Sequence, residues 1–195
     1  MKSSIDIYLN EVINTIFTLD KKKINKLVNE LKKIKLRNGR IFFLGLGGSA
    51  GNTSHAVNDF RKICNIESYA PTDNVSEITA RTNDQGFEKI FSEYLINSKL
   101  NDKDGIFIFS VGGGNKKFKI SLNLIEAIKI AKKKGAKIFS IVGRKDGYAY
   151  KKSDISILTD VKNKKLLTPI SEGLQAIIWH YFVSDKRLQD NKPKW

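Results

Sequence analysis

Three short apolar runs, each followed by glycine, constrain the fold of this chain more than any other feature of its sequence. The runs and their glycine-containing ends are residues 41–46 before 47–51, residues 105–111 before 112–115, and residues 136–142 before Gly143. A weaker run covers residues 154–158. The runs are apolar on both faces and helical stretches separate them, which is typical of a parallel sheet covered by helices on both sides. We therefore expect an α/β fold, a doubly wound domain with a mostly parallel sheet.

The region before the first run has apolar residues at helical spacing. Residues 3–33 predict two helices with a break near Leu19 and Asp20. A chain of 195 residues fits one domain, in which residues 1–35 are a helical arm and residues 36–195 are the α/β core. Because the arm has apolar residues to spare, we expect it to pack against a second subunit.

Two later segments also predict helices. Residues 117–134 place Ile120, Leu124, Ile128 and Ala131 on one face, and Gly135 ends the segment. Residues 169–185 form a last amphipathic segment, with Pro169 suited to the first turn of a helix.

Charge and composition limit the classes of partner. The formal net charge of +15 raises nucleic acid as a partner. However, the lysines are spread along the whole chain, arginine is scarce beside them, and no aromatic residues interleave with them, so nucleic acid is the weakest candidate. No run reaches the length of a membrane span, residues 1–10 lack the apolar core of a secretion signal, and the single Cys64 fits the reducing cytoplasm.

Two glycine-rich loops predict binding of an anion. The first contains Gly47, Gly48 and Ser49, and the second contains Ser110, Val111, Gly112, Gly113 and Asn115. Glycine lets the backbone approach an anion closely, so that exposed N–H groups donate to it, and a following helix adds partial positive charge. One such loop alone would be weak evidence, because it could equally be a tight turn between a strand and a helix. Two of them at corresponding strand ends favour binding of phosphate or a sugar phosphate.

Two pairs of acidic residues and histidines suggest acid–base or metal chemistry. His55 and Asp59 stand at positions i and i+4, so they share one face of a helix. Glu172 lies eight residues before His180, which is about 12 Å along a helix. For both of these side chains to reach one ion they would have to lean toward it, or the helix would have to bend near Gly173. Each histidine alone more often has a structural role, but the two pairs together favour a site.

At this point the chain resembles the phosphoheptose isomerase family of sugar isomerase (SIS) fold proteins. The resemblance is carried by the helical arm, the Gly47 to Ser49 loop, His55, residues 83–87, the Ser110 loop and the last helix ending in His180. It implies a cytoplasmic homotetramer that converts sedoheptulose 7-phosphate to a heptose 7-phosphate for nucleotide-activated heptose and surface polysaccharide. It also implies a zinc ion.

The resemblance assigns roles to individual residues. The implied metal ligands are His55, Asp59, Glu172 and His180; the implied substrate contacts are Asn83, Asp84, Glu172, the Gly47 to Ser49 loop and the phosphate loop from Ser110 to Asn115. The chain departs from the family pattern at Leu46 (asparagine in the family), Asp59 (glutamate), Glu172 (glutamine) and Val111-Gly112 (threonine and serine). These departures suggest a subgroup with altered substrate contacts.

Isomerisation through an enediol needs a base for the carbon-bound proton and an acid for the carbonyl oxygen. We assign Asp59 as the base and His180 as the acid, although either could instead serve chiefly as a metal ligand. Another isomerisation or epimerisation of a phosphosugar is the first alternative. The second is a non-catalytic SIS-fold regulator of the kind that binds the bacterial replication initiator. Such a regulator would have no need of all four ligands together.

Overall fold

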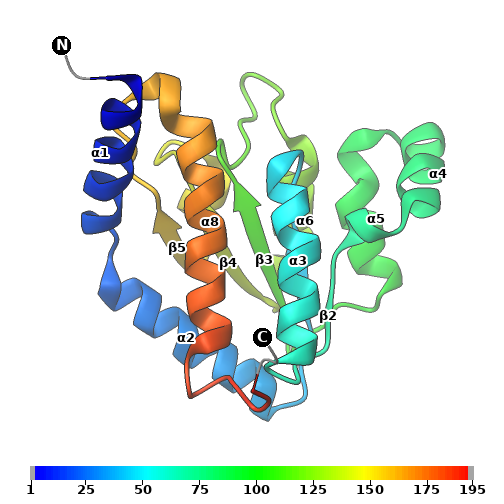
Figure 1. The fold of residues 1–195 in the computed structure, drawn as a ribbon. Helices are drawn as coiled ribbons and strands as arrows, with labels where there is room; N and C mark the ends of the chain where they lie inside the picture. The colour runs from blue at the N-terminus through cyan, green and yellow to red at the C-terminus, as the bar shows by residue number, and fades with distance from the viewer. Residues whose placement is uncertain (1–2, 193–195) are drawn as a thin grey trace.

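The computed structural model describes residues 3–192 and shows a five-stranded sheet surrounded by eight α-helices (Figure 1). The strands are β1 (Ile41–Leu44), β2 (Ser68–Tyr69), β3 (Gly105–Ser110), β4 (Lys137–Val142) and β5 (Ile155–Leu158). The α-helices are α1 (Ser4–Phe17), α2 (Lys21–Leu36), α3 (Gly48–Lys62), α4 (Val75–Gln85), α5 (Ile90–Asn97), α6 (Leu122–Lys133), α7 (Tyr148–Lys152) and α8 (Leu167–Ser184). Short 3₁₀ turns cover Pro71–Asp73, Phe87–Lys89 and Lys164–Leu166.

All neighbouring strands are parallel, in the order β2-β1-β3-β4-β5. The connections therefore reverse direction between β1 and β3, which pair in register from Ile41 opposite Gly105. In open sheets of this topology, ligands bind outside the carboxyl ends of the strands at the point of reversal. The expected α/β doubly wound fold is confirmed, and both glycine-rich loops follow the strands that flank this point.

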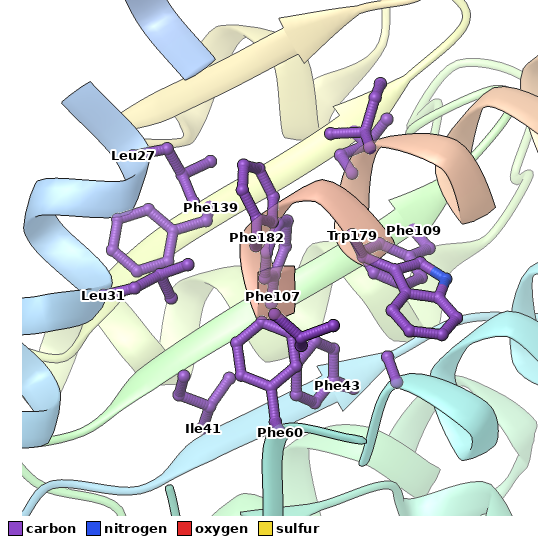
Figure 2. Packing of buried hydrophobic residues seen from close by; sticks show 14 of the residues in the cluster. Leu27, Leu31, Ile41, Phe43, Phe60, Phe107, Phe109, Phe139, Trp179 and Phe182 are labelled. Atoms are coloured by element: carbon purple, nitrogen blue, oxygen red, sulfur yellow. The ribbon is translucent and has the colours of Figure 1, made fainter. Parts of the chain in front are cut away.

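Two apolar layers hold the helices against the sheet. One layer packs α2, α3 and α8 on one face, with Phe43, Phe107 and Phe139 from the strands meeting Trp179 and Phe182 from α8 (Figure 2). The other layer packs α5, α6 and α7 on the opposite face. Full burial of each large side chain contributes about 1.5–3 kcal/mol, so the two layers fix the helices that carry polar side chains at the strand ends.

The N-terminal helices break where the sequence predicts. Asp20 caps α2 by accepting a hydrogen bond from the backbone N–H of Lys23 at 3.0 Å, and α1 ends at Phe17. At the other predicted boundary, Gly135 has a φ of +71° and follows the end of α6. A left-handed φ of this kind costs glycine little, which explains why the helix ends there.

The structure corrects the predicted start of the helix at residues 117–134. Helix α6 begins only at Leu122, because Asn115 and Ile120 pair as an antiparallel bridge and form a small hairpin. Ile120 consequently lies in the hairpin with 54% of its surface exposed, while Leu124, Ile128 and Ala131 are buried as expected. The two-residue strand β2 is a further difference, since it is too short to leave an apolar run in the sequence.

None of the helices within residues 3–192 is both long enough and apolar enough to span a membrane. Cys64 is buried, and burial raises the pKa of its thiol to about 12, so this cysteine is not a candidate nucleophile.

Candidate active site

The loop after β1 leaves room for a carboxylate from α8 at the start of α3. Gly47 has a φ of +59° and stands directly before α3, and Ser49 is buried in its first turn. A Cβ atom added at Gly48 would lie 2.5 Å from Oε2 of Glu172. Glycine at this position therefore leaves the room that the Glu172 carboxylate occupies.

The loop after β3 is held in a fixed shape. The N–H of Gly113 donates to Oγ of Ser110 at 3.0 Å, and the carbonyl oxygens of Val111 and Gly113 accept from Gly143 and Ala149 at 3.0 and 2.8 Å. Because the hairpin at residues 115–120 follows it, this loop does not lead straight into a helix. Backbone N–H groups, rather than the N-terminus of α6, are therefore the donors it can offer.

Helices α3 and α8 run parallel and bring three of the predicted site residues together. The contacts progress in the same direction along both helices, from Gly48 with Glu172 to His55 with Trp179 and His180. One potential ligand atom from each of His55, Asp59 and His180 lies within 4.8 Å of the others. The His55 side chain is 58% exposed and that of Asp59 only 7%, so the group opens to solvent on the imidazole side.

Hydrogen bonds orient two members of this group. Nδ1 of His180 lies 2.8 Å from the carbonyl oxygen of Ala176. A carbonyl oxygen only accepts, so Nδ1 carries the proton and leaves Nε2 of His180 free to bind a metal or to exchange a proton. Asn58 donates to Oδ1 of Asp59 at 2.8 Å, and Oδ2 of Asp59 lies 3.7 Å from Nε2 of His55.

Glu172 lies apart from these three residues, so the structure brings together three of the four predicted metal ligands. Helix α8 runs from Leu167 to Ser184 as one helix, with Gly173 inside it, so the eight residues between Glu172 and His180 keep them about 12 Å apart along the axis. The carboxylate of Glu172 lies instead against Gly48, at the first glycine-rich loop.

Asn83 and Asp84 are likewise not part of the group. Both are exposed near the end of α4, a helix without buried residues, and Nδ2 of Asn83 donates to Oδ1 of Asp84 at 2.8 Å. In Figure 1, α4 lies beside α5, away from α8. These residues thus remain separate from His55, Asp59 and His180 in the structure.

A polar link between α3 and α8 was not predicted from the sequence. Nδ2 of Asn52 donates to the backbone oxygen of Glu172 at 3.0 Å and to Oε1 of Gln175 at 3.1 Å. Gln175 is completely buried. A glutamine on the apolar face of a helix was the signal that could have revealed this link, because buried amides require partners.

The three grouped residues fit a catalytic metal site by their chemistry. Two imidazole nitrogens and one carboxylate oxygen are typical zinc ligands, and catalytic zinc sites use three protein ligands with one open position. His55, Asp59 and His180 could therefore hold a zinc ion with one position open to substrate.

Comparison with known proteins agrees with the fold. The family described as "SIS domain" matches residues 7–143, a stretch that includes His55 and Asp59 and ends before Glu172 and His180. The structure of phosphoheptose isomerase GmhA from Neisseria gonorrhoeae is similar with a TM-score of 0.76 at 21% identity, covering 92% of each chain. The chain is therefore a SIS domain protein.

Sequence relatives show to which family of SIS domain proteins the chain belongs. The phosphoheptose isomerase of Sulfurimonas denitrificans is 32% identical over 158 residues, which cover 76% of each chain. The lincomycin biosynthesis protein LmbN of Streptomyces lincolnensis is 28% identical over 148 residues, and the match spans about half (54%) of LmbN. Within the SIS domain proteins, this chain belongs to the phosphoheptose isomerase family, a family of aldose–ketose isomerases.

Proposed function

We propose that this enzyme interconverts sedoheptulose 7-phosphate and D-glycero-D-manno-heptose 7-phosphate. The observation that carries the proposal is the group of His55, Asp59 and His180 on helices α3 and α8. The same two helices bring Gly48 and Glu172 together nearer their N-terminal ends. The proposed setting is the cytoplasm, where the product would feed nucleotide-activated heptose. Incubation of the purified protein with sedoheptulose 7-phosphate and zinc should yield an aldoheptose 7-phosphate, detected by chromatography and mass. An inactive zinc-loaded protein would contradict the proposal.

The proposed reaction moves one proton between neighbouring carbons. Asp59 is buried and would accept the carbon-bound proton, while Nε2 of His180 would exchange a proton with the substrate oxygen. A zinc ion held by His55, Asp59 and His180 would supply Lewis-acid stabilisation of negative charge on the substrate oxygens. Because the single free lone pair on Nε2 of His180 cannot bind zinc and exchange a proton at the same time, His180 would act either as the acid or as a metal ligand. Asn58 would hold the Asp59 carboxylate in place through its hydrogen bond to Oδ1.

The spacing of the site fits a long, phosphorylated substrate. Seven residues of α3 separate Gly48 from His55, about 10 Å of helix rise. A seven-carbon sugar phosphate can extend over such a distance, with its phosphate at the loop that follows β3. Glu172, which lies at the loop end, is then positioned to contact substrate hydroxyl groups rather than the metal.

The first prediction concerns the phosphate loop. Gly113 has a φ of +68°, so a side chain there would strain the backbone itself, whereas a Cβ at Gly112 meets no atom within 4 Å. We expect Gly112→Ala to fold normally and to raise KM for the phosphosugar by about tenfold or more, because its methyl group occupies the space of the phosphate. Steady-state kinetics and thermal unfolding measure the two effects.

The matched control for this prediction is Gly173→Ala, which adds a methyl group in open space on α8. We expect it to leave KM unchanged. If Gly112→Ala had the wild-type KM, the phosphate would have to bind elsewhere than at this loop.

The second prediction concerns assembly. Apolar side chains on α1 are exposed in the single chain; they are Ile5, Ile7, Leu9, Ile13, Ile16 and Phe17, each at least 38% exposed. At helical spacing all of these except Ile7 lie on one side of α1. Such an exposed apolar stripe is typical of a subunit interface, and we propose the homotetramer that the family resemblance implies. We expect Ile13→Asp with Phe17→Asp to yield smaller species in analytical ultracentrifugation, and Leu36→Asp, at an exposed residue of α2, to leave the assembly intact. If the α1 variant sedimented like the wild type, the exposed apolar side of α1 would be excluded as the subunit interface.

A further inference from the structure

Trp179 contacts both histidines of the candidate metal group. Its ring stacks on that of His180, with centroids 3.6 Å apart and an interplanar angle of 25°. It meets the ring of His55 edge to face, at 4.7 Å and 68°. The two imidazoles lie 5.2 Å apart at 87° to one another. One indole therefore borders both metal-binding side chains that are exposed to solvent.

Trp179 is buried, whereas the His55 and His180 side chains that it contacts are exposed to solvent. The indole is completely buried in the layer between α8 and the sheet (Figure 2). Among the residues that the structure describes, its Nε1 has no hydrogen-bond partner. An unpaired buried N–H group costs about 1–3 kcal/mol, and a phenylalanine would avoid that cost, so the hydrogen bonding of the indole does not account for its presence. The feature that a smaller aromatic residue would lack is the contact of the large indole ring with both histidines.

We propose that Trp179 is a positioning residue that orients His55 and His180 for metal binding. The inference rests on the proposed metal site. Exposed imidazoles without support would sample several rotamers, and the free energy of metal binding would then include the cost of ordering them. The face of the indole holds the His180 ring while Nδ1 is bonded to Ala176, and its edge limits rotation of His55. Neighbours that orient metal ligands in this way typically change metal affinity by about 10- to 100-fold.

Phe182 provides a matched comparison for this role. It lies three residues further along α8, is also completely buried, and packs near Phe107 with ring centroids 6.0 Å apart. Figure 2 shows both aromatic side chains in the same apolar cluster. A leucine at either position removes an aromatic ring from the core, but only the change at Trp179 removes contacts with the histidines.

The test measures binding of Co²⁺, used in place of zinc because its visible spectrum reports ligand geometry. We expect Trp179→Phe, which keeps an aromatic face, to bind Co²⁺ within about threefold of wild type. We expect Trp179→Leu to bind it about 10- to 100-fold more weakly and with altered visible bands. Phe182→Leu should lose stability but keep the wild-type affinity and spectrum. Equal Co²⁺ affinities for Trp179→Leu and Phe182→Leu would overturn the proposal.

A second measurement leaves Trp179 in place, so that it does not depend on a core substitution. The chain has two tryptophans, and Trp195→Phe leaves Trp179 as the only indole. Co²⁺ bound by the adjacent histidines should quench its emission, with saturation at one equivalent per chain. Bound Co²⁺ without quenching would overturn the proposed contact. A wild-type chain that binds no Co²⁺ would overturn both this inference and the proposed metal site, whereas bound metal without isomerase turnover would overturn only the proposed substrate.

Discussion

Replacement of Asp59 by asparagine is expected to lower kcat by about 10²- to 10⁴-fold, the range that a positioned general base contributes. The amide keeps the size of the carboxylate but cannot accept the proton. Asp59 is only 5% exposed, and removing a charge from a buried position should not destabilise the fold. Steady-state kinetics and thermal unfolding are the measurements. Asp190→Asn is the control. It makes the same chemical change at a carboxylate that pairs with Lys35 and is not part of the site, so this variant should retain activity.

The metal content of the Asp59→Asn protein separates two roles of this residue. If Asp59 acts as the base, the variant keeps metal and loses turnover. If Asp59 serves chiefly as a ligand, the metal is lost as well. A variant with wild-type turnover would exclude both roles.

Removal of an imidazole from the metal group is the second change with a large expected effect. We expect His55→Ala to reduce metal affinity by more than about 100-fold, because loss of a direct ligand exceeds the effect of losing a neighbour that orients one. Elemental analysis after purification without chelator should show close to one zinc per chain in the wild type and almost none in the variant. Turnover should fall in parallel and should not return at moderate zinc concentrations.

Glu172→Gln is the matched control for the ligand set. Because the Glu172 carboxylate lies at Gly48 rather than with His55, Asp59 and His180, we expect this variant to keep its zinc. A change in KM without loss of metal would support the proposed contact with substrate. Loss of zinc from Glu172→Gln, or full zinc in His55→Ala, would contradict the three-ligand arrangement.

The sequence predicted four of the five strands because these are short apolar runs separated by helical stretches, a pattern typical of a parallel sheet covered on both faces. The breaks at Asp20 and Gly135 were predictable for a similar reason, since capping and left-handed turns require particular residues. The hairpin at residues 115–120 was not predicted, because Ile120 fits the helical spacing of α6 while its partner Asn115 lies in the preceding loop. Local spacing cannot distinguish a helical turn from such a pairing.

The site was only partly predictable for a related reason. The i, i+4 spacing of His55 and Asp59 places them together on any helix, and the structure adds His180 through the parallel packing of α3 and α8. The position of Glu172 depends on α8 remaining unbent at Gly173, which the sequence left open. The contacts of Trp179 and Gln175 depend on which side of α8 faces α3 and on how far the helices are offset. These are properties of tertiary packing that spacing along one helix does not define.

The central claim is that the protein transfers a proton between the first two carbons of a phosphosugar through an enediol. Incubation of the zinc-loaded protein with sedoheptulose 7-phosphate in D₂O, followed by NMR, tests this claim most directly. We predict that an aldoheptose 7-phosphate forms and that solvent deuterium enters the carbon next to the carbonyl, with both signals absent from Asp59→Asn. A zinc-loaded wild-type protein that gives neither product nor deuterium incorporation would contradict the account.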